Sequence, residues 1–572
     1  MAKKFTTLGI NYGGHDTSAV LMRGGQLIAA CEQERYSLDK HSRRFPMDAI
    51  DDCLNIGEIV INEVNEIAFA FQPTYHIQEA YLRRALDDPE AIGVLLQDVD
   101  RIRENFYVEE TIRKHTNFEG DINFYKHHLC HLASAWYPSG FSESLVISYD
   151  GIGEVESGLM AIGRNGELSV VHNGCRHPDS LGLLYSAITA YLGWRHHCDE
   201  GIVMGLATYG DPYRKIPDDC RTYYEVFEEI LEETGRYDYR INRDWIEYHR
   251  VRDKWISDKF ISVFGPKRQP DTKPTQHHMD IAAALQMRLE AVVLSQLGHA
   301  RNEFGVPRIC LAGGVALNCS LNGKIERSKL FDEIFVQPAS GDAGVALGAC
   351  YLANRIKDQS FSPKKSHNFY LGSIFEDKEV RDALDSRGLT PKFVENIYHT
   401  TAQKLADGKI IGWFQGQAEF GPRALGNRSI LTRPYPSHMK DYLNDRVKYR
   451  EAFRPFAPAV LYEYMNRYFE IQQETPHMLI ASLATPLARE KIPATVHVDN
   501  SCRVQSVQRK NNSRFYDLLH AFNELTDCPV LLNTSFNVKG QPIVNSPEQA
   551  IDCFLATNID CLVIENYVID KD

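Results

Sequence analysis

A unit of three short strand-like stretches separated by glycine turns occurs twice in the first third of the chain. The first copy covers residues 7–31 and the second covers residues 144–172. Each copy has the pattern of an antiparallel meander, with strand-forming residues between turns. Aligning the copies places residues 11–14 (Asn-Tyr-Gly-Gly) over residues 150–153 (Asp-Gly-Ile-Gly). The repeat predicts a duplicated, two-lobed α/β domain, and two unrelated meanders are the alternative.

Two further strand-like stretches, residues 308–312 and 333–337, lead directly into glycine-rich turns. These turns contain Gly313, Gly314, Asn318, Gly341 and Asp342. The order strand, glycine turn, helix favours phosphate binding, because glycine lets backbone N–H groups approach an anion. A long amphipathic helix is predicted just before them, over residues 279–304.

The length of 572 residues exceeds what one ordinary hydrophobic core supports, so at least two domains are expected. A polar segment at residues 354–367 predicts a boundary, with one domain over residues 1–356 and another over residues 368–572. The net charge of −13 excludes a general basic field for nucleic acid. Any phosphate-bearing ligand therefore requires a local cluster of Lys, Arg and backbone N–H groups.

The 13 cysteines include no Cys-x-x-Cys pair, which argues against a zinc ribbon or a thioredoxin-like site. The N-terminal residues lack the apolar stretch of a signal peptide, and no apolar run is long enough for a bilayer. These features predict a cytoplasmic protein that acts without a membrane.

A group of histidines and carboxylates predicts a metal site in the first domain. His127 and His131 are four residues apart in a helix-favouring segment, so both imidazoles lie on one helical face. Asp150 and Asp342 each follow a predicted strand and could add carboxylates. Two His with carboxylates suit iron, manganese or zinc, whereas a merely polar helix face is the alternative. His128 is predicted to face a ligand or to pack.

The second domain contains a dense run of arginines, glycines, prolines and aromatic residues between residues 416 and 458. A solvated helix face has regular charges and few prolines, so the run favours a rigid surface that presents guanidinium groups. Its candidate anion ligands, with those from later strands, are Arg423, Lys448, Arg454, Arg503, Asn533 and Ser535. Surface salt bridges are the alternative for each arginine taken alone.

These motifs together resemble the O-carbamoyltransferase family of antibiotic and nodulation-factor biosynthesis, the tobramycin-type carbamoyltransferases. The matching stretches are residues 9–19, 127–131, 150–151, 204–210, 313–318, 340–348, 420–429, 448–458, 495–505 and 532–540. The resemblance implies a two-lobed domain of the actin-like ATPase class, similar to tRNA threonylcarbamoyltransferases. It also implies a following YrdC-like α/β domain.

The family reaction implies three substrates, namely carbamoyl phosphate, ATP with Mg²⁺, and a hydroxyl-bearing small-molecule acceptor of secondary metabolism. Carbamoyl phosphate is split in the second domain, and the carbamate attacks ATP to give carbamoyl adenylate. The carbamoyl group then passes to the acceptor in the first domain. The six anion ligands above become the carbamoyl phosphate site, and no nucleic acid or membrane partner is implied. A homodimer is compatible with these features.

The resemblance also implies roles for individual residues of the first domain. The metal ligands fall on His127, His131, Asp150 and Asp342, with iron as the usual metal. The catalytic residues implied are His15, Asp16 and Lys40, with His15 as a base or an orienting donor. The ATP-binding residues implied are Gly151, Gly313, Gly314, Asn318 and Gly341. One departure is Ile202, because the family usually has lysine there.

Other functions remain open at this level. The same first domain fits an ATP-dependent kinase or hydrolase of the actin-like class. A protein or nucleoside acceptor is a further alternative to a small alcohol. A non-catalytic carbamoyl phosphate sensor is disfavoured because the histidines and carboxylates of the first domain are present.

Overall fold

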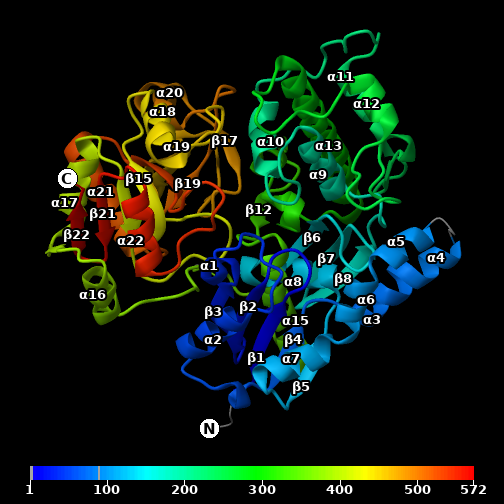
Figure 1. Cartoon of the computed structure of the whole chain (residues 1–572), viewed down its shortest axis with the longest axis horizontal. Helices are drawn as coiled ribbons and strands as arrows, with labels where there is room; N and C mark the ends of the chain where they lie inside the picture. The colour runs from blue at the N-terminus through cyan, green and yellow to red at the C-terminus, as the bar shows by residue number, and fades with distance from the viewer. Residues whose placement is uncertain (1–3, 88–90, 367, 572) are drawn as a thin grey trace. The chain divides into compact units, whose positions relative to one another are not determined.

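The fold is known from a computed structural model, which describes residues 4–87, 91–366 and 368–571 (Figure 1). Its contacts divide the chain into two compact units. Unit 1 comprises Met1–Leu27, Arg43–Met47 and Glu58–Lys365, and unit 2 comprises Ile28–Ser42, Asp48–Gly57 and Ser366–Asp572. Nothing in the sequence pattern indicates that two short N-terminal segments belong with the C-terminal residues.

Unit 1 contains two five-stranded sheets of the same topology. Their orders are β3-β2-β1-β4-β5 and β8-β7-β6-β11-β12. The strands of the first are β1 (Thr6–Asn11), β2 (Ser18–Arg23), β3 (Gln26–Glu32), β4 (Glu66–Phe69) and β5 (Asp121–Phe124). The strands of the second are β6 (Glu143–Tyr149), β7 (Gly158–Arg164), β8 (Glu167–His172), β11 (Arg308–Ala312) and β12 (Glu333–Val336).

Strand direction is also the same in the two sheets. β1 pairs antiparallel with β2 and parallel with β4, and β6 pairs antiparallel with β7 and parallel with β11. The sequence repeat is therefore confirmed as a structural duplication, and the predicted two-lobed actin-like α/β class is confirmed. The turns after β1 and β6 lie at equivalent places in the two copies.

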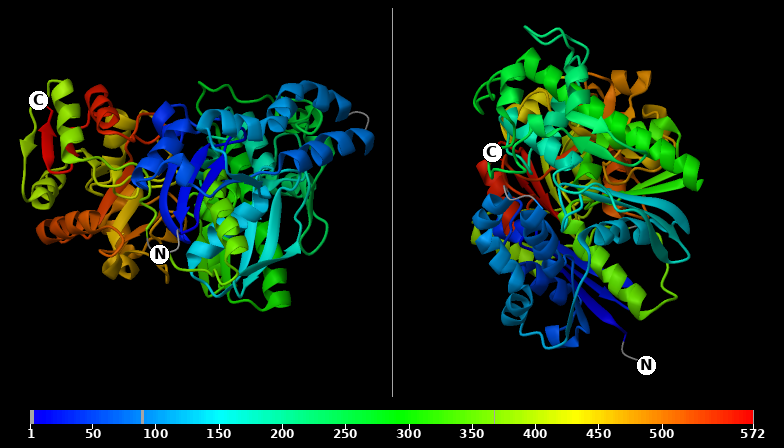
Figure 2. Two further views of the ribbon diagram at one scale, coloured as in Figure 1. Left: turned by 90° about the horizontal axis from the view of Figure 1, so that it is seen from below. Right: turned by 90° about the vertical axis from the view of Figure 1, so that its right-hand side faces the viewer.

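Two helices lie between the sheets of unit 1 (Figures 1 and 2). Helix α8 (His127–Ser139) packs on β6, β7 and β11, whereas α15 (Val345–Lys357) packs on β1, β2 and β4. The helices also pack on each other. A Cβ on Gly348 would lie 1.8 Å from the carbonyl oxygen of Cys130, so only glycine permits this approach. The close packing holds the histidines of α8 in a fixed place relative to both sheets.

The remaining helices of unit 1 cover the sheets and form an outer region. They are α3 (Pro73–His76), the π-helical turn η2 (Ile77–Arg83), α4 (Arg84–Asp87), α5 (Ile92–Gln97), α6 (Val99–Phe106), α7 (Val108–Thr116), α9 (Leu181–Tyr191), α10 (Glu200–Ala207), α11 (Tyr223–Ile230), α12 (Asp258–Phe264), α13 (Gln276–Phe304) and α14 (Cys319–Ser328). A small hairpin joins β9 (Leu231–Glu233) to β10 (Tyr239–Ile241). Helix α13 begins at Gln276, three residues before the predicted start, and Gly305 at φ 68° ends it.

Unit 2 is built on one mixed sheet of eight strands, in the order β13-β22-β21-β14-β15-β20-β16-β19. These strands are β13 (Lys392–Phe393), β14 (Ile411–Phe414), β15 (Arg428–Thr432), β16 (Ala457–Leu461), β19 (Gln505–Val507), β20 (Val530–Ser535), β21 (Cys561–Ile564) and β22 (Tyr567–Asp570). A separate pair consists of β17 (Ala481–Leu483) and β18 (Ser501–Arg503). This arrangement is the α/β unit predicted for the second half.

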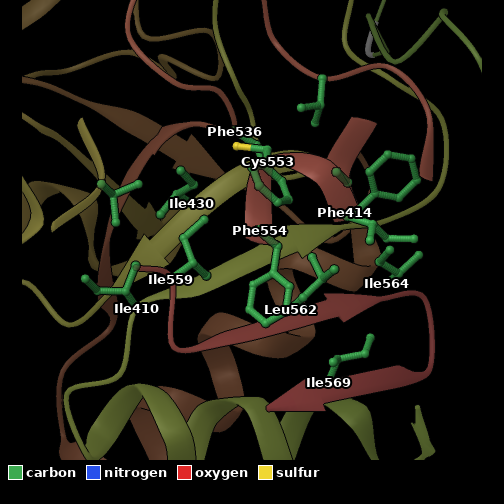
Figure 3. Close-up of a cluster of buried hydrophobic side chains, with 14 of the residues drawn as sticks. Ile410, Phe414, Ile430, Phe536, Cys553, Phe554, Ile559, Leu562, Ile564 and Ile569 are labelled. Carbon is green, nitrogen blue, oxygen red and sulfur yellow. The ribbon is translucent and has the colours of Figure 1, made fainter. Parts of the chain in front are cut away.

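Helices of unit 2 cover the sheet and enclose its hydrophobic core. They include α1 (Glu34–Ser37), α2 (Met47–Ile56), α16 (Asp377–Ser386), α17 (Ile397–Ala406), α18 (Met439–Leu443), α19 (Met465–Tyr468), α20 (Pro486–Lys491), α21 (Ser513–Thr526) and α22 (Pro547–Ala556). Figure 3 shows Phe554 of α22 beside Leu562 of β21, in a cluster that also contains Ile410 and Ile430. Burial of this apolar surface fixes the strand ends that carry the polar residues discussed below.

Within the residues that the structure describes, no helix combines the length and apolarity that crossing a membrane requires.

Candidate functional site

The four predicted metal ligands of unit 1 come together from three separate elements. His127 and His131 lie one turn apart on α8, Asp150 follows β6, and Asp342 begins the 3-10 turn η6 (Asp342–Gly344). His131 Nε2 lies 3.0 Å from Asp150 Oδ2, and His127 Nε2 lies 3.3 Å from the same oxygen. Asp342 Oδ1 lies 3.6 Å from His127 Nε2 and 3.7 Å from His131 Nε2. One ligand atom from each residue lies within 4.8 Å of the others.

Backbone contacts fix this cluster from several sides. The backbone N–H of Gly314 donates to Asp150 Oδ1 at 3.0 Å, so the other oxygen faces the histidines. The amide of Asn11 donates to the carbonyl oxygen of Asp342 at 3.1 Å. His127 N–H donates to the buried carboxylate of Glu154 at 2.9 Å. The donor set is therefore pre-organised by the duplicated strand ends.

The donor set of the cluster fits a divalent metal ion. The Nε2 atoms of His127 and His131 lie only 3.1 Å apart, and both face the Asp150 carboxylate. Burial alone would lower the pKa of His127, but the neighbouring Asp342 and Asp150 outweigh burial and raise it to about 9. Two carboxylates thus stabilise positive charge at this point, whether it is a proton or a cation. Two imidazoles and two carboxylates are ligands that iron, manganese and zinc accept.

His128 points away from the cluster and packs. Its Nε2 donates to the carbonyl oxygen of Glu156 at 2.8 Å, and its Nδ1 lies 3.1 Å from the hydroxyl of Ser148. Burial, with the neighbouring His127 and His131, lowers the pKa of His128 to about 3. Of the two roles predicted for His128, the packing role is the one that the geometry matches.

The glycine turns lie beside the same carboxylates. Gly313 has φ +84°, and a Cβ there would lie 2.2 Å from the carbonyl oxygen of Tyr149. A Cβ on Gly314 would lie 2.9 Å from Asp150 Oδ1, and one on Gly341 would lie 3.5 Å from Asp16 Oδ2. These turns leave backbone N–H groups close to the carboxylates, in the arrangement expected for phosphate contacts.

Gly151 and Asn318 are the remaining two predicted nucleotide residues, and both contact neighbouring side chains of unit 1. A Cβ on Gly151 would reach the side chain of Leu183 at 3.6 Å. Asn318 caps α14, because its Oδ1 accepts from the N–H of Leu321 at 3.0 Å. The same carboxamide exchanges two hydrogen bonds with Gln286, at 2.9 and 3.1 Å. The side chain of Asn318 thus holds a helix end.

His15 and Asp16 lie in the turn between β1 and β2. His15 Nε2 donates to the carbonyl oxygen of His197 at 2.5 Å, and His15 Nδ1 lies 3.4 Å from Asp16 Oδ2. Burial acts to lower the pKa of His15, but Asp16, Asp342 and the His197 carbonyl raise it to about 10. A protonated imidazole donates hydrogen bonds and does not accept a proton. The orienting-donor role therefore matches the geometry better than the base role.

Lys40 lies outside the unit in which it was predicted, and Ile202, where the resembling family has lysine, is buried. Lys40 lies in Ile28–Ser42, a segment of unit 2, although it was predicted within the first domain. A local sequence pattern does not reveal this assignment, because it depends on contacts with residues far along the chain. Ile202 lies on α10 with a buried side chain, so an apolar contact replaces the lysine of the resembling family.

Two of the predicted anion residues of unit 2, Lys448 and Ser535, meet at the end of β20. Lys448 Nζ donates to the carbonyl oxygen of Ser535 at 2.5 Å, to Asn537 Oδ1 at 2.8 Å and to the hydroxyl of Ser535 at 3.3 Å. Burial, with the nearby Arg450 and Arg454, lowers the pKa of Lys448 far below its ordinary value. Lys448 and Ser535 therefore lie together as predicted from their motifs.

Three arginines increase the positive charge around Lys448. Burial, Arg454 and Arg503 lower the pKa of Arg450 far below its ordinary value, and only Glu451 acts to raise it. Arg450 stacks on Phe456 at 4.2 Å and donates to the carbonyl oxygen of Pro455 at 3.2 Å. Glu451, which lies 3.5 Å from Arg454, balances only part of this positive charge, so the excess favours an anionic ligand.

The loop that carries Arg423 is folded around a buried carboxylate. Glu419, 1 % exposed, accepts the N–H groups of Leu425, Asn427 and Arg428 at 2.7, 2.9 and 3.1 Å. Arg428 is entirely buried, and its guanidinium donates to carbonyl oxygens and stacks on Phe414 at 3.6 Å. Of the two arginines in this loop, Arg428 is structural.

Sequence reasoning missed three polar residues of this site. Arg450 lies within the run between residues 416 and 458, but its burial beside other cations has no local signal. Glu419 has an apolar neighbour on each side, which was the only hint that its carboxylate is buried. Gln505 is 2 % exposed and bonds both Leu425 and Asn533, and it begins β19, two residues after Arg503 at the end of β18.

Comparison with known families agrees with this geometry. The model described as Carbamoyltransferase N-terminus matches residues 6–351, and the model described as Carbamoyltransferase C-terminus matches residues 402–571.

The chain belongs to the carbamoyltransferase family.

Two nodulation proteins are among the relatives that this chain resembles in sequence. Nodulation protein NolNO of Sinorhizobium fredii is 39 % identical over 97 % of this chain and 79 % of its own length. Nodulation protein NolO of Bradyrhizobium diazoefficiens is 40 % identical over 78 % of each chain. Among solved structures, full-length HypF in a phosphate- and nucleotide-bound form matches with a TM-score of 0.33 and 13 % identity. That match covers 63 % of this chain and 57 % of HypF.

Proposed function

We propose that this carbamoyltransferase is an ATP-dependent O-carbamoyltransferase with carbamoyl phosphate as carbamoyl donor and a small-molecule alcohol as acceptor. The observation that supports this most directly is the cluster of cations in unit 2. Burial, with Arg450 and Arg454, lowers the pKa of Lys448, and burial, with Arg454 and Arg503, lowers the pKa of Arg450. Glu451 is the acid that acts against this at Arg450. Such a cluster is stable around a dianion such as carbamoyl phosphate.

The chemistry in unit 2 begins with carbamoyl phosphate. Water adds to its carbonyl carbon, the C–O bond to phosphate breaks, and carbamate and phosphate form. A carbamate oxygen then attacks the α-phosphorus of ATP, and pyrophosphate leaves with the bonding electron pair. The guanidinium groups and Lys448 stabilise the charge that develops on the phosphate oxygens. Carbamate decomposes in water, so a closed site is an advantage.

Unit 1 is assigned the transfer step. The acceptor hydroxyl oxygen attacks the carbamoyl carbon of the adenylate, AMP leaves, and the hydroxyl proton is lost to a base or water. The Nε2–H of His15 donates to the carbonyl oxygen of His197, so the Nδ1–H, which lies 3.4 Å from Asp16 Oδ2, is the donor proposed to reach the reacting carbamoyl oxygen or the leaving phosphate. The backbone N–H groups at Gly313 and Gly341 are the proposed contacts to nucleotide phosphates, whereas the N–H of Gly314 holds the carboxylate of Asp150.

His127, His131, Asp150 and Asp342 would hold Fe²⁺ or another divalent metal in unit 1. When bound, such an ion orients nucleotide phosphates and neutralises the charge that develops on them. The support for this assignment is the convergence of two imidazole nitrogens and two carboxylates in a buried place.

Pyrophosphate release from ATP tests this function. With the full chain, release should require carbamoyl phosphate, and a panel of alcohols should contain one that gains the mass of a carbamoyl group. A kinase or hydrolase would instead release phosphate or ADP from ATP without carbamoyl phosphate. Carbamoyl phosphate-independent turnover would contradict the proposal.

A further inference from the structure

Arg35 is held against the loop that carries Arg423. It lies in Ile28–Ser42, a segment of unit 2, and only 4 % of it is exposed. Its Nε donates to Glu32 Oε2 at 3.0 Å, and its Nη2 donates to the carbonyl oxygen of Gly421 at 2.6 Å. The N–H of Gly421 donates to the same Glu32 oxygen at 3.1 Å. This closed ring of hydrogen bonds fixes the guanidinium group relative to the loop.

Glu419 lies two residues before Gly421 in the same loop. Its Oε1 accepts three backbone N–H groups, at 2.7, 2.9 and 3.1 Å, from Leu425, Asn427 and Arg428. All three donors reach one oxygen, and Glu419 Oε2 is buried with no hydrogen-bond partner among the described residues. A buried carboxylate oxygen of this kind calls for a donor that those residues do not supply.

Arg35 offers a complementary donor near this oxygen. Its Nη1 is buried and likewise has no hydrogen-bond partner in the described part of the chain. Burial acts to lower the pKa of Arg35, but the carboxylates of Glu32, Glu419 and Glu34 raise it above its ordinary value. Glu419 and Arg35 are thus close enough to interact, although Nη1 and Oε2 do not bond each other. A buried donor and a buried acceptor in this relation are the partners that an internal water molecule takes.

The loop brings Glu419 next to predicted anion ligands. Glu419 accepts the N–H of Leu425, and the carbonyl oxygen of the preceding residue, Ala424, accepts from Asn533 Nδ2 at 3.3 Å. Arg423 directly precedes Ala424. Only a short stretch of backbone therefore separates Glu419 from two of the predicted anion ligands.

Cleavage of carbamoyl phosphate, as proposed above, needs one water molecule and a group that accepts its proton. The guanidinium groups of the site cannot take that proton, because they are already fully protonated. A carboxylate base makes the water oxygen a stronger nucleophile and contributes about 10²- to 10⁴-fold to a rate. Bulk water would decompose carbamate, so the chemistry favours a single water molecule held in a closed place.

We propose that Glu419 Oε2 and Arg35 Nη1 hold the water molecule that adds to the carbonyl carbon of carbamoyl phosphate, with Glu419 as its base. The water oxygen bonds to the carbon while Glu419 takes one proton. The C–O bond to phosphate then breaks, and the leaving phosphate oxygen keeps the electron pair and receives that proton. The carbamic acid loses its own proton to solvent and becomes carbamate. This inference rests on the proposed function, because it needs carbamoyl phosphate to bind in unit 2.

The Glu419→Gln variant of the full chain tests the inference. Glutamine keeps one oxygen for the three N–H groups and replaces Oε2 with an NH₂ group, which cannot take a proton. The kcat for phosphate release from carbamoyl phosphate, measured with ATP present, should fall at least about a hundredfold. The dissociation constant for inorganic phosphate, measured by calorimetry, should change less than about threefold. A collapsed loop would weaken phosphate binding as well.

Added carbamate distinguishes a missing water nucleophile from other defects. Ammonium carbamate supplies the product of the cleavage step directly. With carbamate in place of carbamoyl phosphate, pyrophosphate release from ATP by Glu419→Gln should therefore reach the level of the wild-type protein under the same conditions. A variant whose fold or ATP reaction is damaged would not recover in this way.

Arg35→Lys provides a second test that does not depend on the folding of Glu419→Gln. It keeps a cation but removes Nη1, so the kcat for phosphate release should fall about tenfold, with the same recovery on added carbamate. Glu565→Gln is the matched control in unit 2, because both oxygens of Glu565 already have donors. Its Oε1 accepts the N–H of Gly416 at 2.6 Å, and its Oε2 lies 2.8 Å from Arg514 Nη1. This control should retain the wild-type kcat.

The outcomes separate this inference from the proposed function. If the wild-type protein does not cleave carbamoyl phosphate, the proposed function fails and the water site fails with it. If the wild-type protein is active and Glu419→Gln or Arg35→Lys keeps the wild-type kcat, the water site is wrong and the proposed function stands. The same conclusion follows if either variant loses activity and added carbamate does not restore pyrophosphate release.

Discussion

The candidate sites of the two units have opposite electrostatic designs. In unit 1, the carboxylates of Asp150 and Asp342 face two imidazoles, and they raise the pKa of His127. In unit 2, Lys448 and Arg450 lie among other cations, and burial and repulsion lower their pKa values. The first arrangement stabilises a cation and the second an anion. This difference supports the proposals of a metal ion in unit 1 and of a phosphate-bearing ligand in unit 2.

Removing a histidine of unit 1 should have the largest effect and should leave unit 2 intact. In His127→Ala, transfer to the acceptor should fall at least about a hundredfold, more than the loss of an outer-shell partner costs. Cleavage of carbamoyl phosphate should persist, since it uses unit 2. Metal content, phosphate release and carbamoylated product are measured together. His299→Ala, at an exposed position of α13, is the control, and retained transfer in His127→Ala would contradict the metal assignment.

Replacing a lysine of unit 2 should weaken anion binding and leave metal binding in unit 1 unchanged. In Lys448→Met, affinity for carbamoyl phosphate should fall about 10- to 100-fold, because a hydrogen bond to a charged group contributes roughly 1.5–3 kcal/mol. Calorimetry gives the affinity, and metal analysis should show no change. Lys510→Met replaces an exposed lysine as the control. An unchanged affinity would mean that Lys448 serves the fold of unit 2 alone.

Acid should destabilise unit 1 through a buried histidine outside the metal cluster. Burial lowers the pKa of His76 to about 4, from about 6.5 in an unfolded chain. The unfolded state therefore binds a proton first as pH falls, and stability is lost between pH 6.5 and pH 4. This contributes a loss of about 2 kcal/mol between pH 7 and pH 5.

Denaturant unfolding at both pH values measures that loss. His76→Asn keeps a donor for the carbonyl oxygen of Glu154 and should remove most of the pH dependence. His520→Asn replaces a half-exposed histidine of unit 2 and should leave the pH dependence of the unfolding free energy unaltered. An identical pH dependence in all three proteins would rule out His76 as its source.

The smallest expected effect concerns the helix cap at Asn318. Asn318→Ala should lower the free energy of unfolding by about 1 kcal/mol, as loss of an N-cap usually does. The KM for ATP should change less than about threefold, a margin of under ~0.7 kcal/mol, because the carboxamide is already bonded to Leu321 and Gln286. Asn396→Ala removes the N-cap of α17 in unit 2 as the control. A larger rise in the KM for ATP would support the predicted contact between Asn318 and the nucleotide.

Local patterns in the sequence were enough to predict many of the strands and helices and part of each candidate site. The glycine turns and strand spacing predicted the duplicated sheets, because meander turns depend on neighbouring residues. The spacing of His127 and His131 placed both on one face of α8, since helical periodicity is also local. The positions of Asp150 and Asp342 beside them followed from strand ends that meet at one edge.

Other features depend on contacts between distant residues and could not be read from the sequence. The assignment of Lys40 to unit 2 depends on residues beyond Ser366. The adjacent Asp16 raises the pKa of His15 most, but the further contributions of Asp342 and the His197 carbonyl come from distant residues. The orientation of Asn533 depends on Gln505 and Leu425. Such contacts carry no periodic signal along the chain.

The division of unit 2 among three stretches of sequence has a consequence for synthesis. The ribosome produces Ile28–Ser42 and Asp48–Gly57 early, but their partners follow only after Ser366. Unit 1 can complete its sheets first, whereas the contacts of these two segments with residues beyond Ser366 form only when translation ends. These two segments are therefore the part of the nascent chain that we expect a chaperone to bind.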